Sequence, residues 1–171
     1  MKVKDVMTSG LLKFCNPETK LTNAAKIMKE ANLGALPVLD KDQKVIGMIT
    51  DRDICLALAV KSKTDPELNV QDTIGKSNVR TVKQEDTVID ALKEMRKNKI
   101  GRLPVTDKEG KLKGILSVNT LLARAISRNE AFGQLTSKDE NLAKTVKAIV
   151  DRNNSKSSKE KKEALGLQLS E

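Results

Sequence analysis

The chain has no histidine, tyrosine or tryptophan, and it has only two phenylalanines in 171 residues. Without histidine it lacks the commonest general base and metal ligand, and no nucleophile stands beside a base, so an enzyme would depend on carboxylates alone. With so few aromatic rings, the chain also lacks the side chains on which proteins stack the bases of single-stranded nucleic acids. These absences argue against catalysis, and no enzyme activity is expected.

Cysteine and long hydrophobic runs are scarce as well. Cys15 and Cys55 show no Cys-x-x-Cys spacing, so no metal site is predicted, and both are interpreted as reduced core residues. The longest apolar run, ICLALAV, is far too short to cross a bilayer. The first ten residues, MKVKDVMTSG, carry charges where a secretory signal needs apolar residues. The expectation is a cytoplasmic protein without a membrane segment.

Positive charge predominates, with a net charge of +9 and a sequence pI of about 9.5. Residues 127–171 hold nine basic and seven acidic side chains, so most of the excess lies in residues 1–126. The densest cluster is RKNKIGR, residues 96–102. It is typical of a solvated helix end, where cations favour the helix dipole, and equally of a phosphate-binding surface. Nonspecific nucleic-acid binding therefore stays open as an alternative.

Two stretches of the chain are nearly copies of each other: GALPVLDKDQKVIGMITDRDI, residues 34–54, and GRLPVTDKEGKLKGILSVNTL, residues 101–121. A shift of 67 residues aligns residues 2–60 with 69–127 without a gap and gives fourteen identities. This agreement indicates an internal duplication. The copies differ at one informative position, because Asp53 in the first becomes Thr120 in the second.

Each copy predicts the same order of elements, β-α-β-β-α. The expected strands are 11–15, 36–40 and 45–50 in the first copy and 79–82, 103–106 and 112–117 in the second; helices are expected at 51–60 and 118–126. The first helix of each copy has apolar residues at i, i+3, i+4 and i+7, which indicates one buried face. Thr19, and Asp86 or Thr87, are the expected helix caps. Gly110 suits the positive φ of a tight hairpin turn.

This reading divides the chain into residues 1–62, 63–127 and 128–171. The polar stretch KSKTDPEL, residues 61–68, is the expected linker. Residues 141–150 predict an amphipathic helix with Lys144 and Lys147 on its polar side, which either covers an edge of the module or a neighbouring subunit or has a separate binding function. The following NNSKSSKEKKE predicts a basic flexible tail.

Taken together, these features resemble the cystathionine-β-synthase (CBS) domain pair, or Bateman module, of the stand-alone type. The likeness covers residues 2–126 and rests on the tandem copies, the GALPVLD and GRLPVTD strands, the VMTSGLLKF segment and a complete Gly-x-x-[Ser/Thr]-x-x-Asp motif in Gly47, Thr50 and Asp53. It implies a mixed α/β fold of two units packed pseudo-symmetrically. It also implies clefts that bind adenosine ligands such as AMP, ADP, ATP or S-adenosylmethionine, and no metal.

The resemblance implies roles for individual residues. Asp53 would accept hydrogen bonds from both ribose hydroxyls, and Thr50 would reach the ribose or a phosphate. Backbone groups around residues 13–15 would read the base edge. Adenine would lie in an aliphatic slot formed by Leu36, Pro37, Met48 and Ile49. The complete expected set is Lys13, Phe14, Cys15, Ala35, Leu36, Pro37, Thr50, Arg52, Asp53, Arg80, Arg102, Pro104 and Ser117.

The two copies imply an asymmetric module. Arg102, just before Leu-Pro-Val in the second copy, is the expected phosphate ligand, with Arg52 and Arg80 as further candidates; the first copy has Ala35 in the matching place. One site would combine Asp53 with Arg102. The other would lack both an acid and a cation, and whether it binds anything is left open.

The function expected from this sequence is regulatory: a nucleotide binds and the module signals through a conformational change. The family implies a homodimer, a disc of four units, for which Ile54, Leu58, Leu121 and Leu122 are the expected contact residues. A separate protein effector is implied, and the sequence does not identify it. A ligand-independent interaction scaffold remains the alternative, and the sequence does not choose among AMP, ADP, ATP and S-adenosylmethionine.

Overall fold

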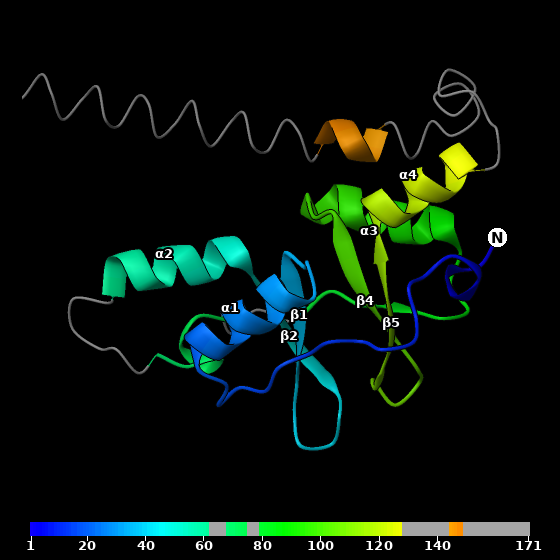
Figure 1. Ribbon diagram of the computed structural model, residues 1–171. Coiled ribbons are helices and arrows are strands. Elements are labelled where there is room, and N and C mark those ends of the chain that lie inside the picture. Colours follow the sequence, from blue (N-terminus) through cyan, green and yellow to red (C-terminus); the bar gives the residue numbers. More distant parts are fainter. Residues whose placement is uncertain (62–67, 75–78, 128–143, 149–171) are drawn as a thin grey trace, which may run out of the picture. The chain divides into compact units, whose positions relative to one another are not determined.

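The computed structural model describes residues 1–61, 68–74, 79–127 and 144–148 of the chain (Figure 1). The predicted linker lies mostly outside these residues, as do the predicted tail and the ends of the helix expected at 141–150. Within the described part, residues 144–148 are helical, and Lys144 and Lys147 are exposed as predicted. No helix among the described residues is both long and apolar enough to span a membrane.

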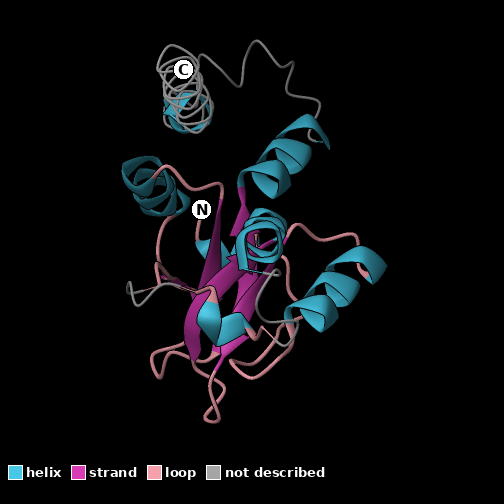
Figure 2. Ribbon diagram, turned by 90° about the vertical axis from the view of Figure 1, so that its left-hand side faces the viewer, coloured by secondary structure: helices cyan, strands magenta, loops and turns pink. Residues whose placement is uncertain are grey.

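The chain forms two compact units. One contains residues 8–84 and 104–115, and the other contains residues 1–7, 85–103 and 116–171. Both units combine helices with strands, so the predicted mixed α/β fold is confirmed (Figure 2). β4 and β5 contribute residues to both units, so the units do not coincide with the two sequence copies. The division at residues 62 and 127 stays a prediction about the repeats.

The helices and strands follow the predicted order in both copies. The first copy contains α1 (Leu21–Glu30), β1 (Ala35–Leu39), β2 (Val45–Thr50) and α2 (Asp51–Lys61). The second contains β3 (Val82–Lys83), α3 (Val88–Asn98), β4 (Arg102–Thr106), β5 (Leu112–Ser117) and α4 (Val118–Ser127), and short 3-10 turns precede the copies at η1 (Val3–Asp5) and η2 (Val70–Asp72). β1 pairs with β2, and β4 lies between β3 and β5.

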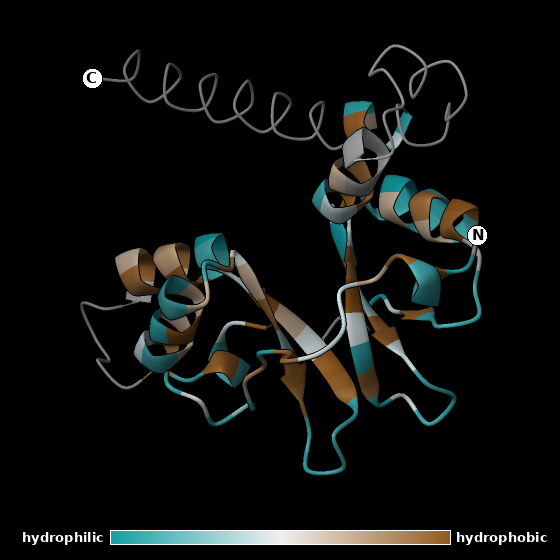
Figure 3. Cartoon of the chain, turned by 45° about the vertical axis from the view of Figure 1, so that its right-hand side comes forward, coloured by the Kyte–Doolittle hydropathy of each residue, from teal (hydrophilic) through white to brown (hydrophobic). Residues whose placement is uncertain are grey.

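The apolar stripes of the helices face buried cores, as predicted. In α1, Leu21, Ala24 and Met28 are buried and belong to a cluster with residues of β1, β2 and α2. The two hairpin turns are hydrophilic (Figure 3). Gly110 has a φ of +86°, which confirms the predicted turn geometry, and Gln43 at the matching place in the first copy adopts a φ of +63°.

The segment that leads into each copy packs against the other copy. Val3 donates its backbone N–H to the carbonyl of Asp86 at 2.9 Å, and Val70 donates to the carbonyl of Thr19 at 2.9 Å. These two bonds are equivalent under the shift of 67 residues. Each compact unit therefore includes the leading segment of one copy and the first helix of the other.

Several local predictions are wrong. Within residues 11–15 only Cys15 pairs as a strand, because a single parallel bridge to Val38 is formed. Lys20, not Thr19, is the N-cap residue of α1, since the Thr19 hydroxyl accepts from the backbone of Asn16 instead. In α3 the predicted cap is confirmed: Thr87 accepts from the N–H of Asp90.

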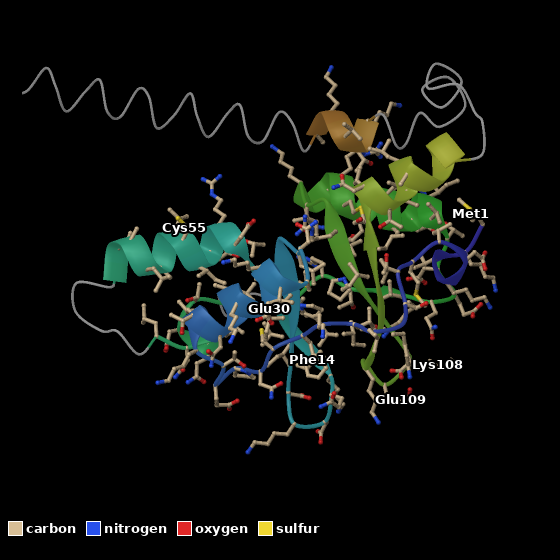
Figure 4. All side chains as sticks on the ribbon, viewed as in Figure 1. Met1, Phe14, Glu30, Cys55, Lys108 and Glu109 are labelled. Carbon is tan, nitrogen blue, oxygen red and sulfur yellow. The ribbon has the colours of Figure 1, made fainter. Side chains whose placement is uncertain are left out.

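Two predictions about exposure are also wrong. Cys15 is buried as predicted, but Cys55 is exposed on α2 (Figure 4). Ile54 and Leu121, expected at a dimer contact, are 4% and 7% exposed and already packed within the chain. The helical stripe was sufficient to predict an apolar face, but it did not show which side of a nearly all-apolar helix faces inward.

Candidate functional site

The Gly-x-x-Thr-x-x-Asp motif lies where β2 ends and α2 begins. The hydroxyl of Thr50 donates to Oδ2 of Asp53 at 2.7 Å, and the Thr50 backbone N–H donates to the same oxygen at 3.0 Å. In return, the backbone N–H of Asp53 donates to the Thr50 hydroxyl at 3.2 Å. These reciprocal bonds form a capping box at the first turn of α2.

The capping box fixes the orientation of a half-buried carboxylate. Oδ2 of Asp53 accepts both bonds from Thr50, whereas Oδ1 accepts none from the residues that the structure describes. The oxygen Oδ1 therefore keeps both of its acceptor positions for another hydrogen-bond donor. Asp53 combines a structural role at the helix start with a remaining capacity to bind.

The second copy reproduces this geometry without the charge. The hydroxyls of Ser117 and Thr120 lie 2.9 Å apart, and the Thr120 backbone N–H donates to the Ser117 hydroxyl at 3.0 Å. A threonine thus fits the same place at the start of a helix. The sequence difference between Asp53 and Thr120 changes the charge of the position while the local hydrogen bonding is retained.

Gly47 allows two neighbouring side chains to approach β2 closely. A Cβ at this position would lie 3.1 Å from Cδ1 of Ile74 and 3.5 Å from Cβ of Val38. The absence of a side chain therefore lets the segment at Ile74 pack directly on β2. The motif glycine serves packing within its own unit.

The register of the β1–β2 hairpin places the residues of the expected adenine slot on two opposite faces. Ala35 pairs with Thr50, and Pro37 pairs with Met48, so these four residues share one face. Leu36 and Ile49, paired on the opposite face, are 0% exposed and belong to the core cluster. The side chains of Leu36 and Ile49 already pack in the core, so their part in an adenine slot stays a prediction. Pro37 and Met48 remain on the face that carries Thr50.

Lys13 and Phe14 line a cavity of about 410 Å³. The other lining residues are Leu12, Ile27, Glu30 and Ala31. Figure 4 labels Phe14 and Glu30. Thr50 and Asp53 do not contribute to this lining, so the structure does not bring Lys13 and Phe14 together with the motif in one cavity.

Cys15, the last of the expected site residues 13–15, uses its backbone in hydrogen bonds to β1. Its backbone N–H donates to Pro37 at 3.0 Å and its carbonyl accepts from Leu39 at 2.9 Å, so this N–H is not available to read a base. Burial raises the pKa of the Cys15 thiol to about 11.

The candidate phosphate ligands differ in their surroundings. Arg52, in the first turn of α2, and Arg80 are exposed. Arg102 begins β4 and is half-buried, and the structure gives its guanidinium no hydrogen bond or ion pair with a described residue. Pro104, two residues further along β4, is buried. Arg102 and Asp53 belong to different compact units.

No three side chains of histidine, cysteine, aspartate or glutamate come together as a metal site within the described residues. The described side chains form a carboxylate and hydroxyl site at the start of α2, with arginine on a separate element. Such a set suits a polar organic ligand with hydroxyl and anionic groups.

Comparison with known proteins identifies the repeats. The family model of the CBS domain matches residues 3–60 and again residues 70–127. The chain belongs to the CBS-domain family. An uncharacterized 17.7 kDa protein of Acidianus ambivalens is 38% identical over 125 residues, which cover 73% of each chain.

Other CBS-domain relatives are much longer than this chain. Inosine-5'-monophosphate dehydrogenase of Aquifex aeolicus is 33% identical over 108 residues, 63% of this chain but only 21% of the enzyme. The chain thus spans about a fifth of that dehydrogenase, and the match covers only its CBS portion.

Two solved CBS-pair structures that share the fold contain adenosine ligands. CBSX2 of Arabidopsis thaliana, solved in complex with AMP, has a TM-score of 0.64 and 28% identity over 75% of this chain and 98% of its own. The CBS pair of protein MJ0100, in complex with 5'-methylthioadenosine and S-adenosyl-L-methionine, has a TM-score of 0.65 and 25% identity over 76% of this chain and 98% of its own.

Sequence reasoning missed the part that α1 plays beside Lys13 and Phe14. Ile27 and Glu30 lie on this helix and line the same cavity, and neither was among the expected site residues. Ile27 is an apolar residue next to the buried stripe of this helix, and its position in the sequence is the signal that could have indicated it.

Proposed function

We propose that this chain is a regulatory CBS pair that binds an adenosine nucleotide and signals through a conformational change. The observation that carries the proposal is the Asp53 carboxylate, which Thr50 holds at the start of α2 with Oδ1 open to a further donor. The AMP complex of CBSX2, a relative that this chain matches over 75% of its length, supports an adenosine ligand.

In the proposed complex, Asp53 binds the ribose. Two neighbouring hydroxyls of a ribose can both donate to one carboxylate, and hydrogen bonds to a charged acceptor are stronger than those between neutral groups. The capping box lowers the entropic cost of binding, because the carboxylate is already oriented before the ligand arrives. The base would lie on the hairpin face that carries Ala35, Pro37 and Met48.

Arg102 is the proposed phosphate ligand, and Arg52 and Arg80 are weaker candidates. A guanidinium can donate two parallel hydrogen bonds to a phosphate, and Arg102 has no competing partner among the described residues. Phosphorylated ligands, AMP, ADP or ATP, would use this cation, whereas S-adenosylmethionine would use it less. We favour the nucleotides for that reason.

The second motif is proposed to bind the same ligands weakly or not at all. Ser117 and Thr120 offer hydroxyls in the geometry of the first motif but no negative charge. Ala35 replaces the arginine in the matching position of the first copy. One ligand per chain is the expected stoichiometry.

Signalling requires that the ligand bind two conformations of the module with different affinity, since it can shift their equilibrium only by that difference. A separate effector protein would recognise the favoured conformation. A homodimer is proposed as the working state. Leu56 and Val60, which are 51% and 76% exposed on α2, replace the buried Ile54 and Leu121 as its expected contacts.

Isothermal titration calorimetry with AMP, ADP, ATP and S-adenosylmethionine tests the proposal. We expect one site per chain, and we expect Arg102→Ala to weaken binding of the nucleotides by at least about tenfold while affecting S-adenosylmethionine less. Lys99→Ala, three residues earlier, is a matched loss of charge. No heat with any of the four ligands would favour the ligand-independent scaffold.

The dimer is tested by light scattering coupled to size exclusion. Wild-type protein is expected at twice the mass of the chain, and the double variant Leu56→Glu and Val60→Glu at the mass of one chain. A monomeric wild-type protein would contradict this part of the proposal.

A further inference from the structure

The helix at residues 144–148 is attached to α3 by a buried hydrogen bond. Thr145 is 0% exposed, and its hydroxyl donates to the backbone carbonyl of Leu92 at 3.1 Å. Both elements belong to the same compact unit. In an α-helix the carbonyl of residue 92 lies one turn before residue 96. The bond therefore places the 144–148 helix beside the turn of α3 that carries Arg96.

This packing brings together positive side chains that are remote in sequence. Lys93 and Lys97 are exposed on α3, Arg96 is half-buried, and Lys99 is exposed just after the helix. We define the α3 basic surface as Lys93, Arg96, Lys97, Lys99, Lys144 and Lys147.

Two carboxylates on the same elements offset part of this charge. Asp90 forms an ion pair with Lys93 at 3.0 Å, and Glu94 accepts a hydrogen bond from Asn98 at 2.8 Å. These are the acidic residues of α3 and of the 144–148 helix. Six cations and two carboxylates leave a local charge of about +4.

We propose that the α3 basic surface binds the phosphate backbone of a double-stranded nucleic acid. A row of closely spaced cations matches a polymer that carries one negative charge per about 1.7 Å of duplex axis. Most of the surface is lysine, which contacts phosphates as a point charge and reads no sequence. Because the chain has no tyrosine or tryptophan, stacking on single-stranded bases is a poor fit.

Other occupants fit this surface less well. A symmetric dimer contact would place the same patch against itself and bring like charges together. A membrane contact would need apolar side chains beside the cations, and Ile89, 47% exposed, is the one large exposed hydrophobic residue among the described residues of α3 and the 144–148 helix. The centre of a protein–protein interface is usually apolar, and a surface with one large exposed hydrophobic residue does not provide such a centre.

Fluorescence anisotropy with a labelled DNA duplex of about 20 base pairs tests the proposal on the full chain. Affinity is expected to fall with salt, with a log–log slope of about −4 to −5 if four to six phosphates are contacted. The triple variant Arg96→Glu, Lys97→Glu and Lys147→Glu is expected to lose at least about a hundredfold in affinity at low salt.

The triple variant Lys41→Glu, Lys44→Glu and Lys108→Glu is the matched control. It changes the net charge equally, but on the exposed hairpin turns, and it should bind within about threefold of wild type. If the first variant fails to fold, Arg96→Gln, Lys97→Gln and Lys147→Gln replaces it, with an expected shallower slope by about 3. Nucleotide titration of the same variants keeps this test separate from the proposed nucleotide site.

Three outcomes would overturn the inference. The first is no binding of the duplex at about 20 mM salt, where backbone contacts are strongest. The second is an equal loss in the hairpin control, which would show that net charge alone matters. The third is binding to phosphatidylserine vesicles without binding to the duplex, which would assign the surface to membranes.

Discussion

The Thr50 hydroxyl lies 2.7 Å from Oδ2 of Asp53, and in the second copy Ser117 and Thr120 hold the same relationship through two hydroxyls 2.9 Å apart. Both copies of the motif therefore begin a helix. Only the first copy also presents a carboxylate. Substitutions at Asp53 can separate these two tasks.

Asp53→Ala is expected to destabilise the protein by about 1 kcal/mol, because it removes the side-chain half of a capping box. Asp53→Thr should cost less, since Thr120 shows that threonine fits the equivalent place. Urea unfolding of both variants measures the difference. Equal losses for alanine and threonine would contradict the equivalence of the two motifs.

The close packing at Gly47 makes a second prediction about stability. Gly47→Ala should destabilise the protein by about 1 to 2 kcal/mol, because the new Cβ would lie 3.1 Å from Cδ1 of Ile74. In the background of Ile74→Val, which removes that methyl group, the same change should cost clearly less. Additive effects in this double-mutant cycle would show that Ile74 is not the neighbour that matters.

The two cysteines should differ sharply toward thiol reagents. Cys55 is exposed and should react within minutes at pH 8. Cys15 is 3% exposed and burial raises the pKa of its thiol to about 11, so it should react only after unfolding. Counting modified thiols by mass spectrometry in native and denaturing buffer tests this. Cys55→Ser is the control and should leave no fast-reacting thiol.

Glu85 should give the attachment of the amino-terminal segment a dependence on acid pH. Hydrogen bonds from Lys2 and then from Lys4 lower the pKa of Glu85 from 4.5 to about 2. Because the folded pKa lies below the unfolded value, the stabilisation is present above about pH 4.5 and is lost as the pH falls toward 2. All three side chains are exposed, so salt should weaken the effect.

NMR titration of the Glu85 carboxyl measures this pKa directly. The double variant Lys2→Ala and Lys4→Ala should return its midpoint to near 4.5. A midpoint near 4.5 in the wild-type protein at low salt would contradict the ion pairs.

The order of helices and strands could be predicted from the sequence because the duplication repeats every local signal. The helical stripes and the alternation in residues 45–50 follow directly from periodicity. The faces of β1 could not be predicted in this way, because residues 36–39 are all apolar and all buried. Only the register with β2 separates Pro37 from Leu36.

The sequence also could not predict that the segment leading into each copy packs against the other copy. Val3 and Val70 are identical in the alignment, which indicates a common role but not the partner that each one contacts. That partner depends on hydrogen bonds to residues 83 and 51 positions away along the chain, Asp86 and Thr19. Local patterns carry no information on such pairings.

At the candidate site, the contact within the motif could be predicted from the sequence, whereas the motif's surroundings could not. Thr50 and Asp53 contact each other as their spacing of three residues at a helix start implies. The cavity beside Lys13 and Phe14 depends on how α1 packs against the preceding segment, which is a tertiary property.

The most direct test is the stoichiometry of AMP binding by calorimetry in wild-type protein, Asp53→Thr and Thr120→Ala. The account predicts one site per chain in the wild type, loss of that site in Asp53→Thr with the fold retained, and no change in Thr120→Ala. Undiminished binding by Asp53→Thr would contradict the central claim that the single carboxylate of the duplicated motif makes the site.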